Sequence, residues 1–344
     1  MNRHGLFLFV NGVTMKNVII TGSHGKSSCA RLVTEAMEQE CAEYRVYMAS
    51  FDQLDDLAIH PDVLIVTNIC SYPLKNMTSY HECVEKIDRL MEMQTKEDLL
   101  ILNADYIFIL SMISGPLKGR RKMFRPRRDE SMDVWIDHEN DFLMAKAGGI
   151  AVPVASRSRL KIPGLRADEV YCACTAFLSE YMEKDKIAGL LKSFSGAEGH
   201  FEYVGSYRGG SIFNNACSVL PSDAVYSLMP FYRKVIFITG GLLKGWPYRG
   251  LGLINVTYAS KLILIGESAD EIERETKKAS CYDSKKIRIY KAGSIGEAVD
   301  IVQKIAEEGD PVVFSPSTPL WDPYDYLAAS DEFKGEIKKM EDFV

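Results

Sequence analysis

Short apolar runs alternate with amphipathic stretches along the first hundred residues. The amphipathic stretches, 27–40 and 80–93, repeat apolar side chains at the spacing of a helix face. The short runs have the length and the Val, Ile and Leu content of buried strands, and they lie at 17–21, 45–48, 63–67 and 99–102. Strands that alternate with helices predict an α/β fold with a mostly parallel sheet.

The same alternation returns in the second half of the chain. Two helical stretches, 169–182 and 186–194, separate the two series. The spacing in the first of them predicts one apolar face, formed by Val170, Cys174, Phe177, Leu178 and Tyr181. In the second series, a helix is predicted at 295–308 and strands at 211–214, 234–239, 261–265, 287–290 and 311–314. A second sheet with its own helices predicts a second domain. We therefore divide the chain into an N-terminal extension (1–14), a first domain (15–198) and a second domain (199–344), with Met1 and Met15 both candidate start residues.

A glycine turn, TGSHGKSS at 21–28, connects the first predicted strand to the first predicted helix. Backbone amides at a helix start, approached through glycine, form a site for anions. In such a turn the Lys26 ammonium pairs with terminal phosphate oxygens, and the Ser27 hydroxyl binds magnesium. The predicted nucleotide-binding residues are Gly22, Ser23, His24, Gly25, Lys26, Ser27 and Ser28.

This turn is shorter than the standard phosphate loop. The standard loop has its first glycine five residues before the second, where this chain has Ile20. The strand before the turn and the helix after it favour a phosphate loop over a chance match. An ordinary strand-to-helix turn is the alternative interpretation.

Composition and charge exclude several classes of protein. Of 344 residues, 47% are hydrophobic and 26% are charged, which is typical of a globular protein. The net charge of -6 predicts no general attraction to nucleic acid or to anionic membranes, and no apolar stretch reaches the roughly 18 residues of a membrane helix. The eight cysteines are scattered without a CxxC pair, so we interpret them as reduced thiols of a cytoplasmic protein.

Basic residues are concentrated at 115–130, GPLKGRRKMFRPRRDE. One interpretation is a solvated loop whose charge is partly offset by Asp129 and Glu130. The other is a landing site for a polyanionic small molecule, because arginine binds carboxylates and phosphates in bidentate fashion. Nucleic acid is less favoured, since few aromatic residues interrupt the segment.

Eight stretches carry a resemblance to a known family, and they occur in the order in which the family has its motifs. They are TGSHGKSS (21–28), VTNI (66–69), LNADY (102–106), KIPG (161–164), FSGAEGHFEYV (194–204), FNNACSVLPSDA (213–224), ITGGLLKG (238–245) and FSPSTPLWD (314–322). Over residues 15 to about 335 the chain resembles the Mur ligase superfamily, above all the type that adds D-glutamate to a muramoyl-alanine precursor. The resemblance implies a P-loop central domain that binds ATP and a Rossmann-like C-terminal domain.

The resemblance also implies a chemistry. Ligases of this family use ATP and Mg²⁺ to convert a carboxylate into an acyl phosphate, which an amine then attacks, so that ADP and phosphate are released. Besides the phosphate loop, it implies catalytic roles for Lys244, His200 and Asn215. It implies substrate contacts for Asn68, Ser315 and Trp321.

Several positions depart from the family pattern. No UDP-binding domain precedes the loop in this sequence, so we expect a substrate other than the usual UDP-muramoyl precursor. The family's magnesium-binding glutamate falls on Tyr47, its Asp-His pair on 72–73, and a catalytic lysine on Cys217. Since magnesium prefers one or two carboxylates plus water, the candidate replacement ligands are Asp52, Asp55 and Asp56, of which Asp52 is the one predicted beside Ser27. A surface turn without a metal is the alternative interpretation of these three residues.

Three functions are compatible with these features. The first is a ligase that joins a carboxylate to an amine. The second is a related synthetase that closes a ring on a polyanionic precursor of a nickel-tetrapyrrole coenzyme. The third is a nucleotide-binding protein with little or no ligase activity, because several family residues are replaced.

Overall fold

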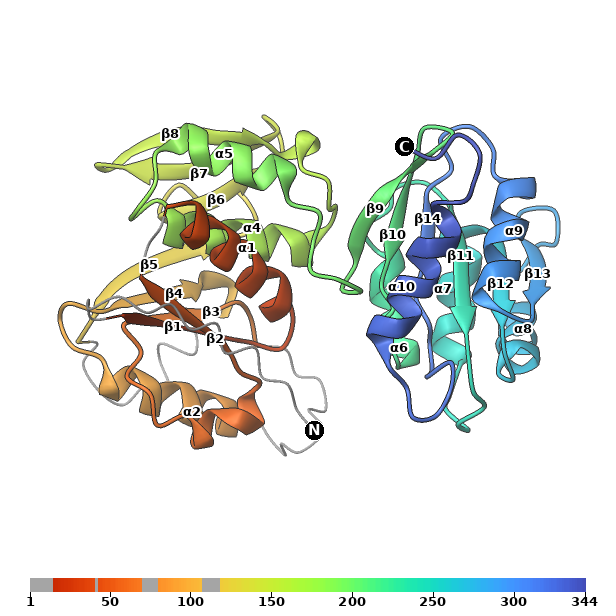
Figure 1. Ribbon diagram of the computed structural model, residues 1–344, viewed down its shortest axis with the longest axis horizontal. Coiled ribbons are helices and arrows are strands. Elements are labelled where there is room, and N and C mark those ends of the chain that lie inside the picture. The colour runs from red at the N-terminus through yellow and green to blue at the C-terminus, as the bar shows by residue number, and fades with distance from the viewer. Residues whose placement is uncertain (1–14, 41–42, 70–79, 107–117) are drawn as a thin grey trace. The chain divides into compact units, whose positions relative to one another are not determined.

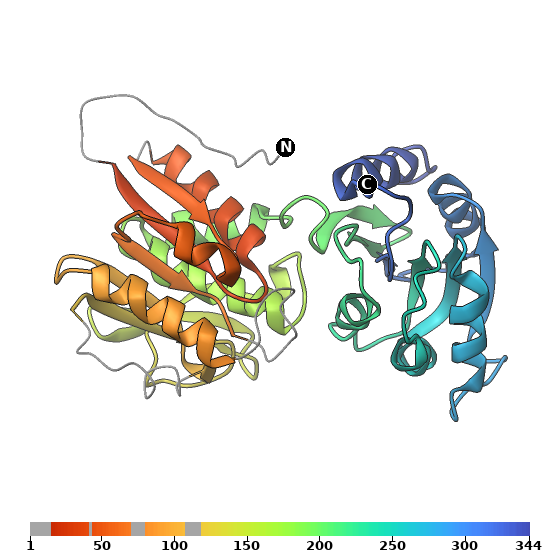
Figure 2. The ribbon, with the colours of Figure 1, turned by 90° about the horizontal axis from the view of Figure 1, so that it is seen from below.

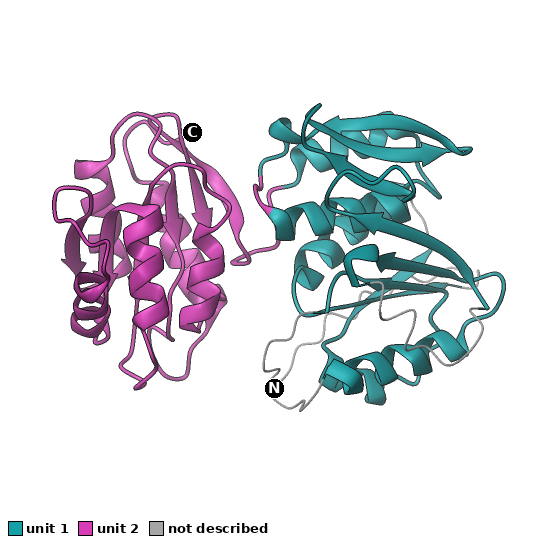
Figure 3. Cartoon of the chain, turned by 180° about the vertical axis from the view of Figure 1, so that it is seen from behind, with its two compact units in different colours: residues 1–161, 165–194 teal, residues 162–164, 195–344 magenta. Residues whose placement is uncertain are grey.

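The protein has two compact units, each built on its own sheet. The computed structural model describes residues 15–40, 43–69, 80–106 and 118–344. One unit comprises residues 1–161 and 165–194, and the other comprises 162–164 and 195–344 (Figure 3). Both sheets are mostly parallel and carry helices on both faces. This arrangement confirms the predicted α/β fold class.

The sheet of the first unit has the order β2-β1-β3-β4-β5-β6-β7-β8, and it is parallel from β2 to β6. Strands β7 and β8 continue it as antiparallel hairpins. Its strands are β1 (Lys16–Thr21), β2 (Tyr44–Met48), β3 (Val63–Val66), β4 (Leu99–Asn103), β5 (Arg120–Arg125), β6 (Val134–Asp137), β7 (Phe142–Ala147) and β8 (Ile150–Ser156). The first four lie where the apolar runs predict them.

Helices cover both faces of this sheet. They are α1 (Lys26–Gln39), α2 (Tyr80–Met93), α4 (Leu165–Leu178) and α5 (Lys184–Ser193). Helix α2 covers one face and lies in front in Figure 2, whereas α1 and α4 lie on the other face (Figure 1). The prediction of one apolar face on α4 is wrong, because residues 168–178 are buried on all sides of the helix. Helix α4 packs against α1 and strands β4 to β7 together, which leaves no solvent side.

The sheet of the second unit is also mostly parallel. Its strand order is β13-β12-β11-β14-β10-β9, and only β9 is antiparallel. Its strands are β9 (Glu202–Tyr207), β10 (Gly210–Asn214), β11 (Val235–Gly240), β12 (Ala259–Ile265), β13 (Arg288–Ala292) and β14 (Val312–Phe314). Its helices are α6 (Pro221–Leu228), α7 (Arg249–Tyr258), α8 (Ala269–Lys278), α9 (Ile295–Ile305) and α10 (Tyr326–Ile337).

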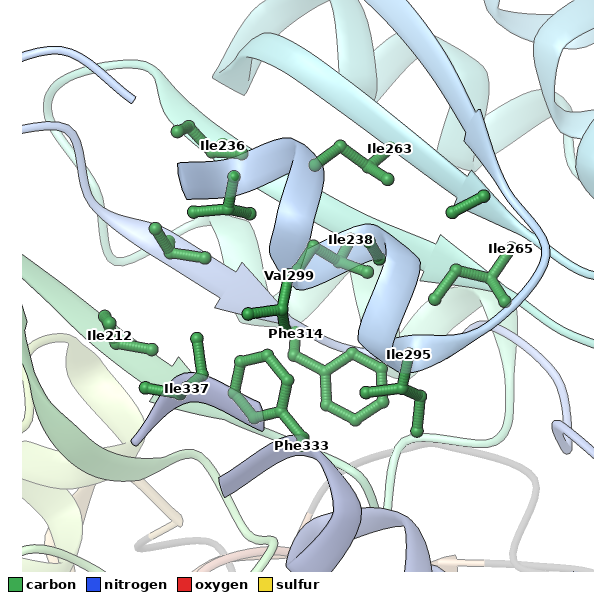
Figure 4. Packing of buried hydrophobic residues seen from close by; sticks show 14 of the residues in the cluster. Ile212, Ile236, Ile238, Ile263, Ile265, Ile295, Val299, Phe314, Phe333 and Ile337 are labelled. Carbon is green, nitrogen blue, oxygen red and sulfur yellow. The ribbon is translucent and has the colours of Figure 1, made fainter. Parts of the chain in front are cut away.

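Strand β11 shows why this sheet is buried on both faces. Ile236 and Ile238 pack with the residues of α9 and α10 in one core (Figure 4). Val235 and Phe237 point the opposite way and pack with α6, α7 and α8. Since neighbouring side chains on a strand alternate between faces, a continuous apolar run fills both cores.

The cysteines and the lengths of the helices can be described for most of the chain. The described cysteines, six in number, are free thiols, and Cys41 and Cys70 lie outside the described residues. Among the helices of the described ranges, none combines the length and apolarity that crossing a membrane requires.

Candidate functional site

The predicted phosphate loop connects β1 to α1 at the carboxyl ends of the parallel strands. Gly22 has φ +144°, and a Cβ on it would lie 2.1 Å from Oγ1 of Thr67, so only glycine fits. Gly25, with φ +79°, precedes the first helical residue, Lys26. The amine of Lys26 folds back and donates to the carbonyl of Gly22 at 2.6 Å. The amino end of α1 is thereby presented by a closed turn, which is the geometry of an anion site.

Two residues that follow β3, Thr67 and Asn68, hold the backbone of the loop by hydrogen bonds. The side-chain oxygen of Asn68 accepts from the backbone amide of His24 at 2.9 Å, and its amide group donates to the His24 carbonyl at 3.1 Å. The hydroxyl of Thr67 donates to the same carbonyl at 2.7 Å. Asn68 is only 1% exposed. Its side chain, predicted to contact substrate, instead supports the loop backbone.

A buried carboxylate connects this support to the next strand. Glu169 on α4 is 5% exposed, and it accepts from the amides of Asn68 at 2.7 Å and Asn103 at 3.3 Å. Asn103, the last residue of β4, also donates to the backbone carbonyl of Thr67 at 3.0 Å. One side chain of α4 therefore joins the ends of β3 and β4 beneath the loop.

Burial lowers the pKa values of two loop side chains, Lys26 and His24. It lowers the pKa of Lys26 to about 8, against the opposing effect of the Asp52 carboxylate. It also lowers the pKa of His24 to about 3, with further contributions from Arg166 and Lys26, so His24 is neutral at pH 7. Its Nε2 lies 3.1 Å from a guanidinium nitrogen of Arg166, which can only donate. Arg166 thus brings a second cation to the loop.

Thr67, Arg166 and Glu169 were not identified as site residues from the sequence. Arg166 is 142 residues from its partner His24, and Glu169 is 101 residues from Asn68. The only signal that could have found Glu169 is a charged residue near the start of a helix that is otherwise mostly apolar. Such residues are rarely buried without a partner.

The two predicted metal ligands lie on neighbouring segments. Ser27 is the second residue of α1, and its hydroxyl contacts the sulfur of Met48 at 3.4 Å. Asp52 belongs to the short helix η1 (Phe51–Asp56) and is close enough to Lys26 to affect its pKa. Asp55 of the same helix is instead held in ion pairs by Lys86 and Arg89.

A separate group of side chains has metal-binding geometry. Ligand atoms of His60, Asp62 and Asp98 lie within 4.8 Å of one another. These residues lie at or before the amino ends of β3 and β4, whereas the phosphate loop lies at the carboxyl ends. Within the described ranges, no such group of His, Cys, Asp and Glu side chains includes Asp52.

The second unit brings two of its predicted residues together. The amide of Asn215 donates to the hydroxyls of Ser227 at 2.7 Å and Ser315 at 3.2 Å. Its oxygen accepts from the backbone of Phe201 at 3.1 Å. Ser315 is fully buried, so Asn215 and Ser315 form part of a polar cluster after β10 and β14.

The remaining predicted residues of this unit lie in different surroundings. The amine of Lys244 pairs with Asp322 at 3.3 Å, next in sequence to Trp321, which packs partly on the core beneath α10. Nδ1 of His200 donates to the carbonyl of Glu198 at 2.8 Å, and its ring meets the edge of Tyr326. The Nδ1 proton is therefore committed to the backbone.

The described part of the basic segment is a largely exposed loop only at residues 126–130, where Asp129 pairs with Arg125 and Glu130 pairs with Arg128. Residues 120–125 form β5 between β4 and β6. Arg120 and Lys122 pair with Glu180 at 2.6 Å each, and Arg125 pairs with Asp105 at 3.0 Å. Carboxylates of the same unit thus neutralise much of the charge on which the polyanion landing site depends.

We expect the stability of the first unit to depend on pH through Glu169. Burial raises the pKa of this carboxyl from 4.5 to about 7, Asp105 and Asp168 add to the rise, and Asn68 and Arg166 oppose it. The folded state therefore holds the proton more tightly than the unfolded chain. The resulting stabilisation is complete below pH 4.5 and is lost as the pH rises through about 7.

The measurement is urea unfolding of the wild type and Glu169→Gln at several pH values. The free energy of unfolding of the wild type relative to the variant should fall by about 2–3 kcal/mol between pH 5 and pH 8. A difference that does not change with pH would contradict the raised pKa.

A known protein resembles this chain over most of its length. No family model matches the chain. A UDP-N-acetylmuramoylalanine–D-glutamate ligase of Acetivibrio thermocellus is 29% identical over 299 residues, which cover 86% of this chain and 63% of that ligase. The chain thus spans less than two thirds of that relative's length.

Solved structures show the same fold. MurF from Acinetobacter baumannii superposes with a TM-score of 0.66 at 13% identity and covers 93% of this chain and 77% of its own. MurF ligase from Thermotoga maritima, solved in complex with ADP, has a TM-score of 0.63 at 15% identity, with 95% and 81% covered. Together with the ordered motifs and the two mostly parallel sheets, these findings make the chain similar to the Mur ligases in sequence and alike in fold.

Proposed function

We propose that the protein is an ADP-forming ligase that uses ATP to activate a carboxylate as an acyl phosphate and joins it to an amine. The observation that carries this proposal is the closed turn at Gly22–Lys26, fixed by Thr67 and Asn68 at the carboxyl ends of β1 and β3. A carboxylate is a poor electrophile at neutral pH, so amide formation needs an activating phosphate. The turn supplies the donors that such a phosphate requires.

In this proposal the loop residues hold the terminal phosphates of ATP. Lys26 exchanges its contact with the Gly22 carbonyl for phosphate oxygens, and the phosphate charge further favours its ammonium form by raising its pKa. The amides at the start of α1 stabilise charge that spreads over the transferred group. Arg166 adds a second cation beside His24.

Magnesium fits this site through oxygen ligands. Ser27 and Asp52 would hold it, because hydroxyl and carboxylate oxygens suit a hard cation that keeps several waters. When bound, magnesium would neutralise phosphate charge. Tyr47, which packs against the core under α2, offers no carboxylate for this purpose.

The second unit would supply groups for the activated acid and the amine. Lys244 and His200 are proposed to act on phosphate oxygens, and Asn215 is proposed to support the reacting groups. Ser315 and Trp321 are proposed to line the substrate side. Asn68 supports the loop and is no longer proposed as a substrate contact, because its amide and oxygen are occupied inside the fold.

The substrate is proposed to be a carboxylate on a small molecule other than the usual UDP-muramoyl precursor. A polyanionic substrate, and with it ring closure on a nickel-tetrapyrrole precursor, stays a prediction. It is less favoured, because Arg120 and Arg125 of β5 already form ion pairs with carboxylates of the same unit. Tyr47 favours a second candidate, a nucleotide-binding protein with little ligase activity. A cytoplasmic location, where ATP is abundant and thiols stay reduced, fits either proposal.

Phosphate release separates the two candidates. The full chain is mixed with ATP, Mg²⁺, a panel of carboxylates and an amine, and hydroxylamine is added in a parallel series to trap acyl phosphate as a hydroxamate. Carboxylate-dependent phosphate release with hydroxamate formation supports the ligase. Binding of ATP without stimulated release supports the nucleotide-binding protein, and no binding of ATP rejects both.

Replacing Asp52 should reveal whether it is a metal ligand. We expect Asp52→Asn to raise the Mg²⁺ concentration needed for half-maximal ATP turnover about tenfold, because one charged oxygen ligand is lost. Asp56→Asn, in the same short helix, is the matched control and should leave the Mg²⁺ dependence unchanged. Equal Mg²⁺ curves for Asp52→Asn and the wild type would remove Asp52 from the site.

A further inference from the structure

Glu169 is a buried carboxylate that the proposed chemistry does not use. Its two oxygens accept from two different asparagine amides, Oε2 from Asn68 at 2.7 Å and Oε1 from Asn103 at 3.3 Å. Burying a carboxylate is costly unless hydrogen bonds compensate it. The presence of a buried carboxylate at this position therefore needs a functional explanation.

The hydrogen bonds of Asn68 indicate what that role is. Its oxygen accepts from the His24 amide, and its Nδ2 donates to the His24 carbonyl. If the side-chain amide were turned over, donor would face donor and acceptor would face acceptor. A carboxylate can only accept, so Glu169 selects the orientation in which Nδ2 points toward it. That orientation is the one that pairs with both backbone groups of His24.

Asn103 is fixed by the same logic. Its Nδ2 donates both to Glu169 and to the backbone carbonyl of Thr67, and its oxygen accepts from the backbone amide of Asp105. Thr67 in turn donates through its hydroxyl to the His24 carbonyl. Two series of hydrogen bonds therefore connect Glu169 to the His24 carbonyl. One runs through Asn68, and the other runs through Asn103 and Thr67.

We propose that Glu169 is a positioning residue that, through Asn68, holds the backbone at His24 in the conformation that binds the phosphates of the nucleotide. This inference rests on the proposed nucleotide-binding function of the loop. Glu169 itself does not contact phosphate in this proposal. It acts by restricting a side-chain amide to one of two orientations, which keeps the loop ready for the anion before it arrives.

A purely structural role for Glu169 predicts a different result. In that case its replacement lowers the stability of the unit, but folded molecules bind phosphate as before. Asp168, the neighbouring residue on α4, provides a matched control. It is also buried, at 4% exposed, but its partners among the described residues are Arg157 and His138, neither of which supports the loop.

The test measures binding of ATP and of inorganic tripolyphosphate to the full chain by calorimetry at pH 8. Glu169→Gln keeps the shape of the side chain but turns a donor toward one of the two asparagines. We expect it to weaken binding of both probes about tenfold or more, whereas Asp168→Asn binds them as the wild type does. Thermal unfolding of each variant confirms that the molecules measured are folded.

Asn68→Ala interrupts the same connection from the loop side and serves if Glu169→Gln fails to fold. Alone, it should weaken tripolyphosphate binding as strongly as Glu169→Gln does. In the double variant the two losses should not add, because both remove one interaction. Additive losses, or wild-type binding by Glu169→Gln or by Asn68→Ala, would overturn the positioning role. Failure of the wild type to bind ATP would instead reject the proposed function.

Discussion

Replacing Lys26 with alanine is expected to lower the rate of ATP-dependent phosphate release by about 10²–10³-fold. The change removes the ammonium that the loop aims at the terminal phosphate, and loss of one such preorganised donor has effects of this size. The amine contacts only the Gly22 carbonyl among the hydrogen bonds described for it. Its ammonium form is disfavoured by burial, so the empty fold should tolerate its loss.

The measurement compares phosphate release and ATP affinity of Lys26→Ala with those of Lys192→Ala. Lys192 is exposed near the end of α5, and its replacement should leave both quantities at their wild-type values. Urea unfolding should show a free energy of unfolding for Lys26→Ala within about 1 kcal/mol of the wild type. A folded Lys26→Ala protein that releases phosphate at the normal rate would refute the role of the loop.

Replacing Phe333 with alanine should destabilise the second unit by about 3–5 kcal/mol. Phe333 on α10 is fully buried, and its ring stacks on that of Phe314 with centroids 4.6 Å apart (Figure 4). Phe314 belongs to the central strand β14, so removing the Phe333 ring leaves a cavity between α10 and the sheet. The loss combines the transfer free energy of the ring and the cost of the cavity.

Glu332→Ala is the matched control, because Glu332 is the exposed neighbour of Phe333 on the same helix. Its free energy of unfolding should stay within about 0.5 kcal/mol of the wild type. Hydrogen exchange followed by mass spectrometry assigns the loss to residues 195–344 and should leave protection of the phosphate loop unchanged. A loss below about 1 kcal/mol for Phe333→Ala would mean that α10 does not close this core.

Several elements could be predicted because their signal is local. The runs that became β1, β3, β4, β11 and β12 are short and apolar, and each lies within a few residues of its predicted position. The helix after the glycine turn is indicated by its spacing and by Gly25, whose φ of +79° suits no other residue as well. The sequence therefore predicted the order of strand, turn and helix correctly, and binding of phosphate by the turn stays a prediction.

Other elements were not predictable in the same way. Strand β5 carries the charges of a surface loop, and only carboxylates distant in sequence, such as Glu180 and Asp105, make it acceptable inside a sheet. The apolar face expected on α4 did not appear, because that helix is enclosed by α1 and four strands. The spacing of apolar residues along a segment indicates which faces of a helix are apolar. It does not indicate how many neighbouring helices and strands cover that helix.

The sequence by itself determined that this chain forms two sheets of the α/β class and that a glycine turn connects the first strand to the first helix. Both depend on periodicity and on glycine, which act over a few residues. Only the tertiary structure decided that Asn68 serves the loop and that Glu169 and Arg166 reach it from α4. These contacts join residues that are 44 to 142 positions apart, and such distances are closed by packing of the sheet and its helices, which no local pattern encodes.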